Sequence, residues 1–315
     1  MNMHAMQYKQ YGGVEQLEWV ECPRPVPEEG QMLVRVSATS VNPIDWKMMS
    51  GKYRLILRAP KPCTPCFDIC GVVEELGPGV EGFAVGDRVF TREPGLRGGG
   101  AAEYAVIKTD TAAHAPQGVS DEECAAAPLV ALTALQGLRL CKGLLQDNRL
   151  LVLGASGGVG HLAVQIAKLH GVHVTGVCSS KNVEFVRSLG ADSVIDYTQT
   201  NDLGTDCFDA ILDCAGKASW GSLSKALTSN GIVGEVAPEV RHFWPMLTLP
   251  LYSRKRLKMV MMSEDRKDLQ SIGTWMEEEK LKVEVEQVYQ GLEQLPEAFQ
   301  RSMSNRTRGK LVLKP

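Results

Sequence analysis

The first part of the chain consists of short apolar stretches separated by turn residues. Glycine and proline turns such as Gly77-Pro78-Gly79 and Gly86-Asp87 divide residues 5–115 into segments of strand length. Alternating apolar and polar positions bounded by turn residues are typical of β-strands. The segments are QLEWVE, QMLVRVSATSV, DICGVVEELG, DRVFT and AAEYAVI. This pattern predicts an all-β region over 5–115.

The pattern changes near Ser120. Residues 121–143 are rich in alanine and leucine, and Ser120 and Glu123 have the spacing of a helix capping box. Apolar strands then alternate with helical segments, which predicts a parallel sheet covered by helices on both faces. The alternating segments are LLVLGA, GHLAVQIAKLH, HVTGVCS, VEFVRSLG, DAILDCAG, ASWGSLSKAL and GIVGEVA. After about residue 265 the chain predicts a helix, a strand, a second helix and a last strand, GKLVLKP.

A glycine-rich loop lies between the first strand and the first helix of the alternating region. Gly154, Gly157 and Gly160 follow the strand LLVLGA directly. A strand, glycine loop and helix in this order bind a dinucleotide pyrophosphate on backbone N–H groups. The same glycines also suit ordinary turns and helix packing, but the flanking strand and helix favour the cofactor. The expected contacts are Ala155, Ser156, Gly157, Gly158, Val159 and Gly160.

The end of the second strand of this region indicates which coenzyme is bound. Enzymes that use NAD carry an acid there, about 20 residues after the loop, and it binds the ribose 2′-hydroxyl. This chain has Ser179, Ser180 and Lys181 instead. Two hydroxyls and a cation suit a 2′-phosphate, so the sequence predicts NADPH. The alternative interpretation is that Lys181 is an ordinary solvated lysine of the loop.

Composition and charge narrow the classes of function. The chain has 315 residues and a net charge of −3, without the basic excess of a nucleic-acid-binding protein. No run approaches the roughly 18 apolar residues of a membrane span. Nine cysteines are scattered through the chain, which indicates reduced thiols rather than a disulfide framework. The first residues, MNMHAMQYKQYGG, match neither a signal peptide nor a transit peptide, so no cleavable targeting signal is expected.

Five motifs occur in the order found in one enzyme family. They are Asn42-Pro43-Ile44-Asp45-Trp46-Lys47, the segment 65–73 (PCFDICGVV), Gly86-Asp87-Arg88-Val89, the loop 154–160 and Leu189-Gly190-Ala191-Asp192. The chain resembles the zinc-independent quinone oxidoreductase branch of the medium-chain dehydrogenase/reductase superfamily, in particular plant enone oxidoreductases and chloroplast-envelope homologues. The resemblance implies an α/β chain with two domains. A GroES-like, β-rich catalytic domain would comprise 1–119 and 266–315, and a Rossmann domain with a doubly wound parallel sheet would comprise 120–265.

The resemblance also implies residue roles. Asn42 would lie beside the nicotinamide ribose, Lys47 would face the substrate, and Tyr53 would be a second donor in the same loop. Tyr197 would flank the adenosine end of the cofactor, although a half-buried tyrosine at a strand end is the alternative. The remaining cofactor contacts would be Thr133, Cys214, Gly216 and Lys310.

No metal is expected. A catalytic zinc needs three protein ligands, and the zinc branch carries G-H-E where this chain reads Phe67-Asp68-Ile69. The first cysteine ligand is replaced by Asn42-Pro43, and the four-cysteine lobe after residue 90 is missing. Cys63, Cys66 and Cys70 form a cluster that suggests a metal, but no fourth ligand lies nearby in the sequence. Loop and strand thiols are the favoured interpretation.

These observations predict an NADPH-dependent reductase of quinones or of the C=C bond of enones. Without zinc, hydride transfer relies on the cofactor, on positioning and on hydrogen bonds. Two alternatives are a non-catalytic, crystallin-like NADPH-binding protein and a membrane-peripheral protein. The second rests on residues 239–258, which are apolar and then basic, but which also suit an active-site mouth and a dimer contact. The expected partners are a small-molecule substrate and a second copy of the chain, in the cytoplasm or associated with the chloroplast.

Overall fold

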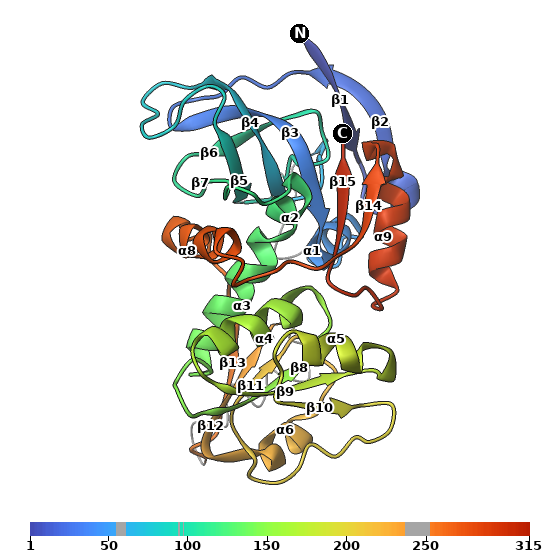
Figure 1. Cartoon of the computed structure of the whole chain (residues 1–315). Helices are drawn as coiled ribbons and strands as arrows, with labels where there is room; N and C mark the ends of the chain where they lie inside the picture. The colour runs from blue at the N-terminus through green and yellow to red at the C-terminus, as the bar shows by residue number, and fades with distance from the viewer. Residues whose placement is uncertain (55–60, 94, 97, 237–252) are drawn as a thin grey trace. The chain divides into compact units, whose positions relative to one another are not determined.

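The computed structural model describes residues 1–54, 61–93, 95–96, 98–236 and 253–315. The chain divides into two compact units, Met1–Leu129 with Glu264–Pro315 (unit 1) and Val130–Ser263 (unit 2) (Figure 1). The sequence placed these boundaries after residues 119 and 265, and both positions need correction. Helix α2 (Asp121–Ala126) packs on the sheet of unit 1, and Glu264 forms an ion pair with Arg92 of the same unit.

Unit 1 is built around a mixed sheet. Its strands, in the described residues, follow the order β14-β15-β3-β4-β5-β7, and β6 also pairs with β3. Strand β15 from the C-terminus lies antiparallel to β3 near the N-terminus, so the last segment of the chain completes this sheet (Figure 1). A smaller sheet pairs β1 with β2. The bounds are β1 Asn2–Gln7, β2 Glu18–Pro23, β3 Gln31–Val41, β4 Asp68–Leu76, β5 Arg88–Arg92, β6 Tyr104–Lys108, β7 Ala113–His114, β14 Val285–Gln290 and β15 Lys310–Lys314.

Helix α1 (Pro43–Met49) interrupts the region that the sequence predicted to be all β, and the prediction is wrong there. Proline suits the first position of a helix, and the Asn42 backbone N–H donates to the Asp45 carboxylate at 2.6 Å. These two features start a helix that is too short to produce a clear helical period in the sequence. The other helices of unit 1 in the described residues are α2, α8 (Arg266–Glu277) and α9 (Leu295–Met303), with short 3₁₀ turns at Val14–Gln16 and Leu292–Gln294.

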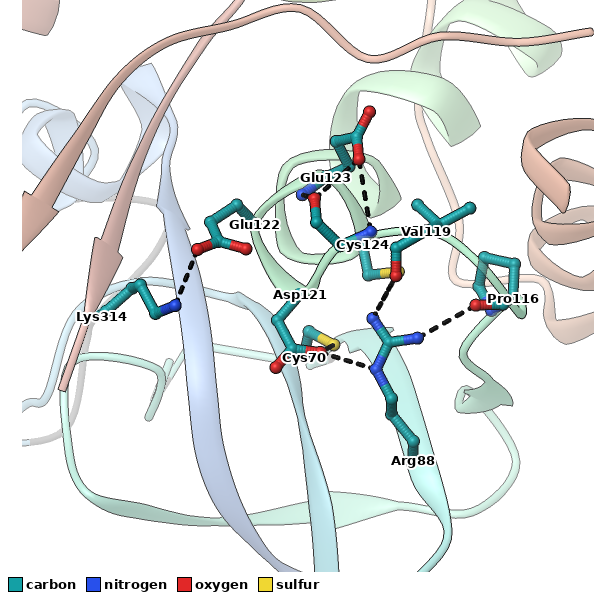
Figure 2. A network of polar contacts seen from close by, with 10 residues as sticks. Cys70, Arg88, Pro116, Val119, Asp121, Glu122, Glu123, Cys124 and Lys314 are labelled. Atoms are coloured by element: carbon teal, nitrogen blue, oxygen red, sulfur yellow. Dashed lines mark hydrogen bonds and ion pairs between the residues drawn. The ribbon is translucent and has the colours of Figure 1, made fainter. Parts of the chain in front are cut away.

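Helix α2 is fixed to the sheet by a polar network (Figure 2). The predicted capping box is confirmed, because the Glu123 N–H donates to Ser120 Oγ at 3.2 Å and the Ser120 N–H donates to Glu123 Oε2 at 3.3 Å. From β5, Arg88 donates to the Asp121 carboxylate at 2.6 Å and to the Val119 carbonyl at 2.6 Å. These contacts explain why the helix belongs to unit 1.

Unit 2 contains the predicted parallel sheet. Its strands, in the described residues, are all parallel and follow the order β10-β9-β8-β11-β12-β13. Residues 150–152 of β8 are fully buried, as expected for a strand covered on both faces. The strands are β8 Arg149–Leu153, β9 His173–Cys178, β10 Ser193–Asp196, β11 Phe208–Asp213, β12 Leu227–Glu235 and β13 Arg256–Met259. The helices in the described residues of this unit are α3 Pro128–Leu140, which begins in unit 1, α4 Gly158–Leu169, α5 Val183–Ser188 and α6 Trp220–Ala226, with a 3₁₀ turn at Ser180–Asn182.

Candidate functional site

The glycine loop joins β8 to α4 at the carboxyl end of the central strand. Gly154 has a φ of +74°, which favours glycine. A Cβ on Gly160 would lie 2.1 Å from the Gly154 carbonyl oxygen, so the helix can approach the loop only because residue 160 is glycine. This close approach is what a dinucleotide-binding turn requires. The loop therefore fits the pyrophosphate of a nicotinamide coenzyme.

The loop lies at the point where the strand order of the sheet reverses. From β8 the chain builds outward through β9 and β10, and then β11 adds to the other side of β8. Ligands of open parallel sheets bind at such switch points. The Asp213 carboxylate at the end of β11 accepts the N–H groups of Ala215 and Gly216 at 2.9 and 2.8 Å, and the Cys214 N–H donates to the Leu153 carbonyl at 3.1 Å. Cys214 and Gly216 thus lie beside the start of the glycine loop.

The turn after β9 lies at the same edge. Asn182 Nδ2 donates to Ser156 Oγ of the glycine loop at 3.0 Å, which joins the two turns. Ser180 and Lys181 are exposed and Ser179 is half-buried. The structure therefore brings the predicted loop residues and the Ser179–Lys181 segment together. Thr133 is buried in α3.

An acidic residue, Asp196, also lies at this edge. Asp196 is the last residue of β10, and it pairs in register with Cys178 at the end of β9. The Ser180 hydroxyl donates to the Asp196 carboxylate at 2.5 Å. The sequence carries no signal for Asp196 in this role, because the acid of NAD enzymes is expected at the end of the second strand, whereas Asp196 ends the third. The next residue, Tyr197, is 56% exposed, so it is not the half-buried tyrosine of the alternative interpretation.

Unit 1 holds a buried polar cluster formed by Ser40, Asn42, Asp68 and Lys310. The Asp68 carboxylate accepts hydrogen bonds from Ser40 Oγ at 2.9 Å and from Asn42 Nδ2 at 2.8 Å. Lys310 Nζ donates to Asn42 Oδ1 at 2.5 Å and to the Val41 carbonyl at 2.9 Å, and it lies 3.7 Å from Asp68 Oδ2. The side chain of Asn42 is therefore held between an ammonium group and a carboxylate.

Burial sets the electrostatics of this cluster. It raises the pKa of Asp68 and lowers the pKa of Lys310, while the two opposite charges act against these shifts. Burial also raises the pKa of the neighbouring Asp45 to about 7. The sequence assigned Asn42 and Lys310 to the cofactor as separate residues, and the structure places both in this one cluster. Asn42 is fully buried and Lys310 is 3% exposed.

The two predicted substrate donors follow Asn42 along the chain. Lys47 lies in the last turn of α1, with its Nζ 5.4 Å from the centroid of the Trp46 ring. Tyr53 is half-buried, and burial raises the pKa of its phenol. Both side chains are on unit 1, like Asn42 and Lys310.

The segment predicted as an active-site mouth or membrane contact, 239–258, lies outside the described residues up to position 252. At its basic end, Lys255 Nζ donates to the Ser224 carbonyl at 2.5 Å, and Arg254 is exposed. No helix among the described residues is long and apolar enough to cross a bilayer. Among all the residues that the structure describes, no three His, Cys, Asp or Glu side chains are arranged to hold a metal ion.

Two features together define the medium-chain dehydrogenase/reductase class. The last segment of the chain completes the sheet of the first unit, and the parallel sheet of the second unit has a glycine loop at its switch point. Family models agree: residues 28–117 match the alcohol dehydrogenase GroES-like domain, and residues 189–313 match the zinc-binding dehydrogenase model. The chain belongs to the quinone oxidoreductase branch of this superfamily, and it is an oxidoreductase.

Individual relatives support this placement. A chloroplast envelope quinone oxidoreductase homologue from Arabidopsis thaliana is 36% identical over 99% of this chain and 98% of its own length. A chloroplastic NADPH-dependent alkenal/one oxidoreductase from the same plant is 37% identical over 68% of this chain and 58% of its own length. The solved structure of the quinone oxidoreductase from Coxiella burnetii covers 100% of both chains with a TM-score of 0.88 at 30% identity.

Proposed function

We propose that this protein is an NADPH-dependent reductase of quinones or of the C=C bond of α,β-unsaturated carbonyls. The observation that carries the proposal is the edge of unit 2, where the glycine loop and the Ser179–Lys181 turn are joined by the hydrogen bond from Asn182 to Ser156. The activities in the names of the relatives point to the same chemistry. The names of both relatives refer to the chloroplast, and we place this chain in association with the chloroplast as well.

Different residues of unit 2 would bind different parts of the coenzyme. Backbone N–H groups of the loop 155–160 would bind the pyrophosphate, and Lys181 would supply positive charge to the 2′-phosphate. Tyr197, Cys214 and Gly216 line the same edge. In unit 1, Lys310 and Asp68 fix the orientation of the Asn42 amide. Asn42 is our candidate for the nicotinamide ribose, and since it is fully buried, coenzyme binding would have to expose part of this cluster. Bound in this way, NADPH supplies a hydride.

The substrate oxygen needs a hydrogen-bond donor, because negative charge develops there when a quinone or enone accepts a hydride. A donor aimed at that oxygen lowers the barrier. Lys47 would supply this hydrogen bond, and Tyr53 would be a second donor. For an enone the hydride enters at the β-carbon and a proton from water completes the product at the α-carbon. No metal ion takes part in this scheme.

The test is NADPH consumption, followed by its near-ultraviolet absorbance, with a panel of quinones, short enones and saturated ketones. We expect turnover with quinones or enones, none with saturated ketones, and the same rate after incubation with a strong zinc chelator. A protein that binds NADPH but turns over no member of the panel would instead be the non-catalytic alternative. The metal-free scheme would be contradicted if the protein contained one zinc ion per chain and the chelator removed the zinc and the activity together.

A further inference from the structure

The carboxylate of Asp196, at the edge of unit 2, accepts hydrogen bonds from two neighbouring hydroxyl groups. Ser180 Oγ lies 2.5 Å from Asp196 Oδ2 and donates to it. The other carboxylate oxygen, Oδ1, accepts the Thr198 N–H at 2.9 Å and the Thr198 hydroxyl at 2.7 Å. The Ser180 and Thr198 hydroxyls also lie within hydrogen-bond distance of each other, with 2.7 Å between Ser180 Oγ and Thr198 Oγ1.

The charge of Asp196 is stable because these donors favour the ionised form. The hydrogen bond from Ser180 lowers the pKa of Asp196, with further contributions from Thr198. A hydroxyl has one hydrogen to donate. While Asp196 accepts that hydrogen, Ser180 can offer a ligand only its oxygen lone pairs.

This arrangement works against a 2′-phosphate. A phosphate carries between one and two negative charges near neutral pH and accepts hydrogen bonds. At this edge it would gain the charge of Lys181, but it would meet the Asp196 carboxylate and an oxygen of Ser180 with no hydrogen to give. The 2′-hydroxyl of NADH is neutral, so the repulsion would not act on it.

We propose that Asp196 is a specificity-determining residue that limits the preference of this enzyme for NADPH, acting partly by orienting the Ser180 hydroxyl away from the coenzyme. The proposal rests on the proposed function, in which Ser180 and Lys181 bind the adenosine 2′-phosphate. It adds an acid from the third strand to the set of residues that choose between the two coenzymes.

The variant Asp196→Asn tests this proposal with little structural change. The amide oxygen can still accept the Thr198 N–H, so the turn after β10 is retained. The amide nitrogen can donate to Ser180 Oγ, which reverses that hydrogen bond and leaves the Ser180 hydrogen for a ligand or for Thr198 Oγ1, 2.7 Å away. The change thus removes a negative charge, and Ser180 no longer donates its hydrogen to residue 196.

Binding is measured by fluorescence titration of NADPH and NADH and by competition with adenosine 2′,5′-bisphosphate and 5′-AMP. We expect Asp196→Asn to bind NADPH and the bisphosphate about 3- to 10-fold more tightly, the effect of removing one nearby like charge in water. Binding of NADH and 5′-AMP should change by less than about twofold. Unchanged or weaker NADPH binding would overturn the proposal, and so would a selective loss of NADH binding, which would mean that Asp196 binds the ribose 2′-hydroxyl.

Two further variants separate this proposal from the proposed function. Asp192→Asn removes a carboxylate just before β10 that is bonded to Lys168, 2.8 Å away, and it should leave the ratio of NADPH to NADH affinity unchanged. Lys181→Ala should weaken NADPH binding about 10- to 100-fold and spare NADH, because a charge-assisted contact is lost. If Lys181→Ala spares NADPH, the phosphate site itself is wrong. If it weakens NADPH while Asp196→Asn has no effect, only the role of Asp196 is wrong.

Discussion

Replacing Lys310 with methionine should lower the free energy of unfolding by about 3–5 kcal/mol, the effect of removing one partner from a buried ion pair. The Lys310 ammonium is buried and lies 3.7 Å from Asp68 Oδ2. Its loss would leave a carboxylate in the interior of unit 1 with only neutral donors. It would also leave the Val41 carbonyl and Asn42 Oδ1 without the hydrogen bonds that Lys310 donates.

Urea unfolding followed by circular dichroism measures this effect, and the same strand offers a matched control. Lys314, at the other end of β15, forms a partly exposed ion pair with Glu122 at 2.7 Å. An ion pair of that kind contributes about 1 kcal/mol or less, so Lys314→Met should have a small effect. Adding Asp68→Asn to Lys310→Met should recover part of the lost stability, because the unpaired charge is then removed. Equal effects of Lys310→Met and Lys314→Met would contradict the buried ion pair.

The variant Lys47→Ala should lower kcat by about 10²- to 10³-fold, the usual effect of removing a hydrogen bond made to a developing oxyanion. Alanine is the best helix former, so α1 and the Asn42 backbone contact with Asp45 should be retained. The coenzyme does not depend on Lys47 in this scheme, so the Kd for NADPH should stay within about twofold of the wild-type value, a difference well below 1.4 kcal/mol. Steady-state kinetics on the best substrate and a coenzyme titration measure both quantities.

The control for Lys47→Ala is Lys52→Ala, which removes an exposed lysine from the turn after α1. It should leave kcat unchanged. Wild-type kcat in Lys47→Ala would show that Lys47 is not the donor, and the phenol of Tyr53 would then be tested with Tyr53→Phe. A loss of kcat in both lysine variants would mean that the charge of the segment, and not one hydrogen bond, supports the reaction.

The sequence predicted most of the fold because its signals are local. The apolar run in β8, the glycine loop and the helical period of α4 each lie within a few residues. Helix α1 was missed because it has seven residues, too few for a period to emerge. Its start signal was nevertheless present in Asn42-Pro43 with an acid at position 45. The first domain boundary was placed too early because the change in composition at Ser120 precedes α2, which packs on unit 1.

The candidate site was predictable only where its residues follow one another. The loop 154–160 and the Ser179–Lys181 turn are continuous segments, and the sequence identified both. The contact between Lys310 and Asn42 joins residues 268 positions apart, and no pattern in the sequence relates them. The bond from Ser180 to Asp196 depends on the register between β9 and β10, which is a property of the folded sheet. The chemistry of single residues can therefore be predicted from the sequence, but the pairs that share a hydrogen bond cannot.

The central claim, that this protein transfers a hydride from NADPH to a quinone or enone, is tested most directly by isotope transfer. The enzyme is incubated with NADPH that carries deuterium on the transferable C4 position and with a short enone, and the product is analysed by mass spectrometry and NMR. The account predicts a saturated ketone with one deuterium on its β-carbon and hydrogen from water on its α-carbon. A product whose β-carbon carries hydrogen from the solvent would contradict the account. So would a panel in which every enone is recovered unchanged and every quinone remains oxidised.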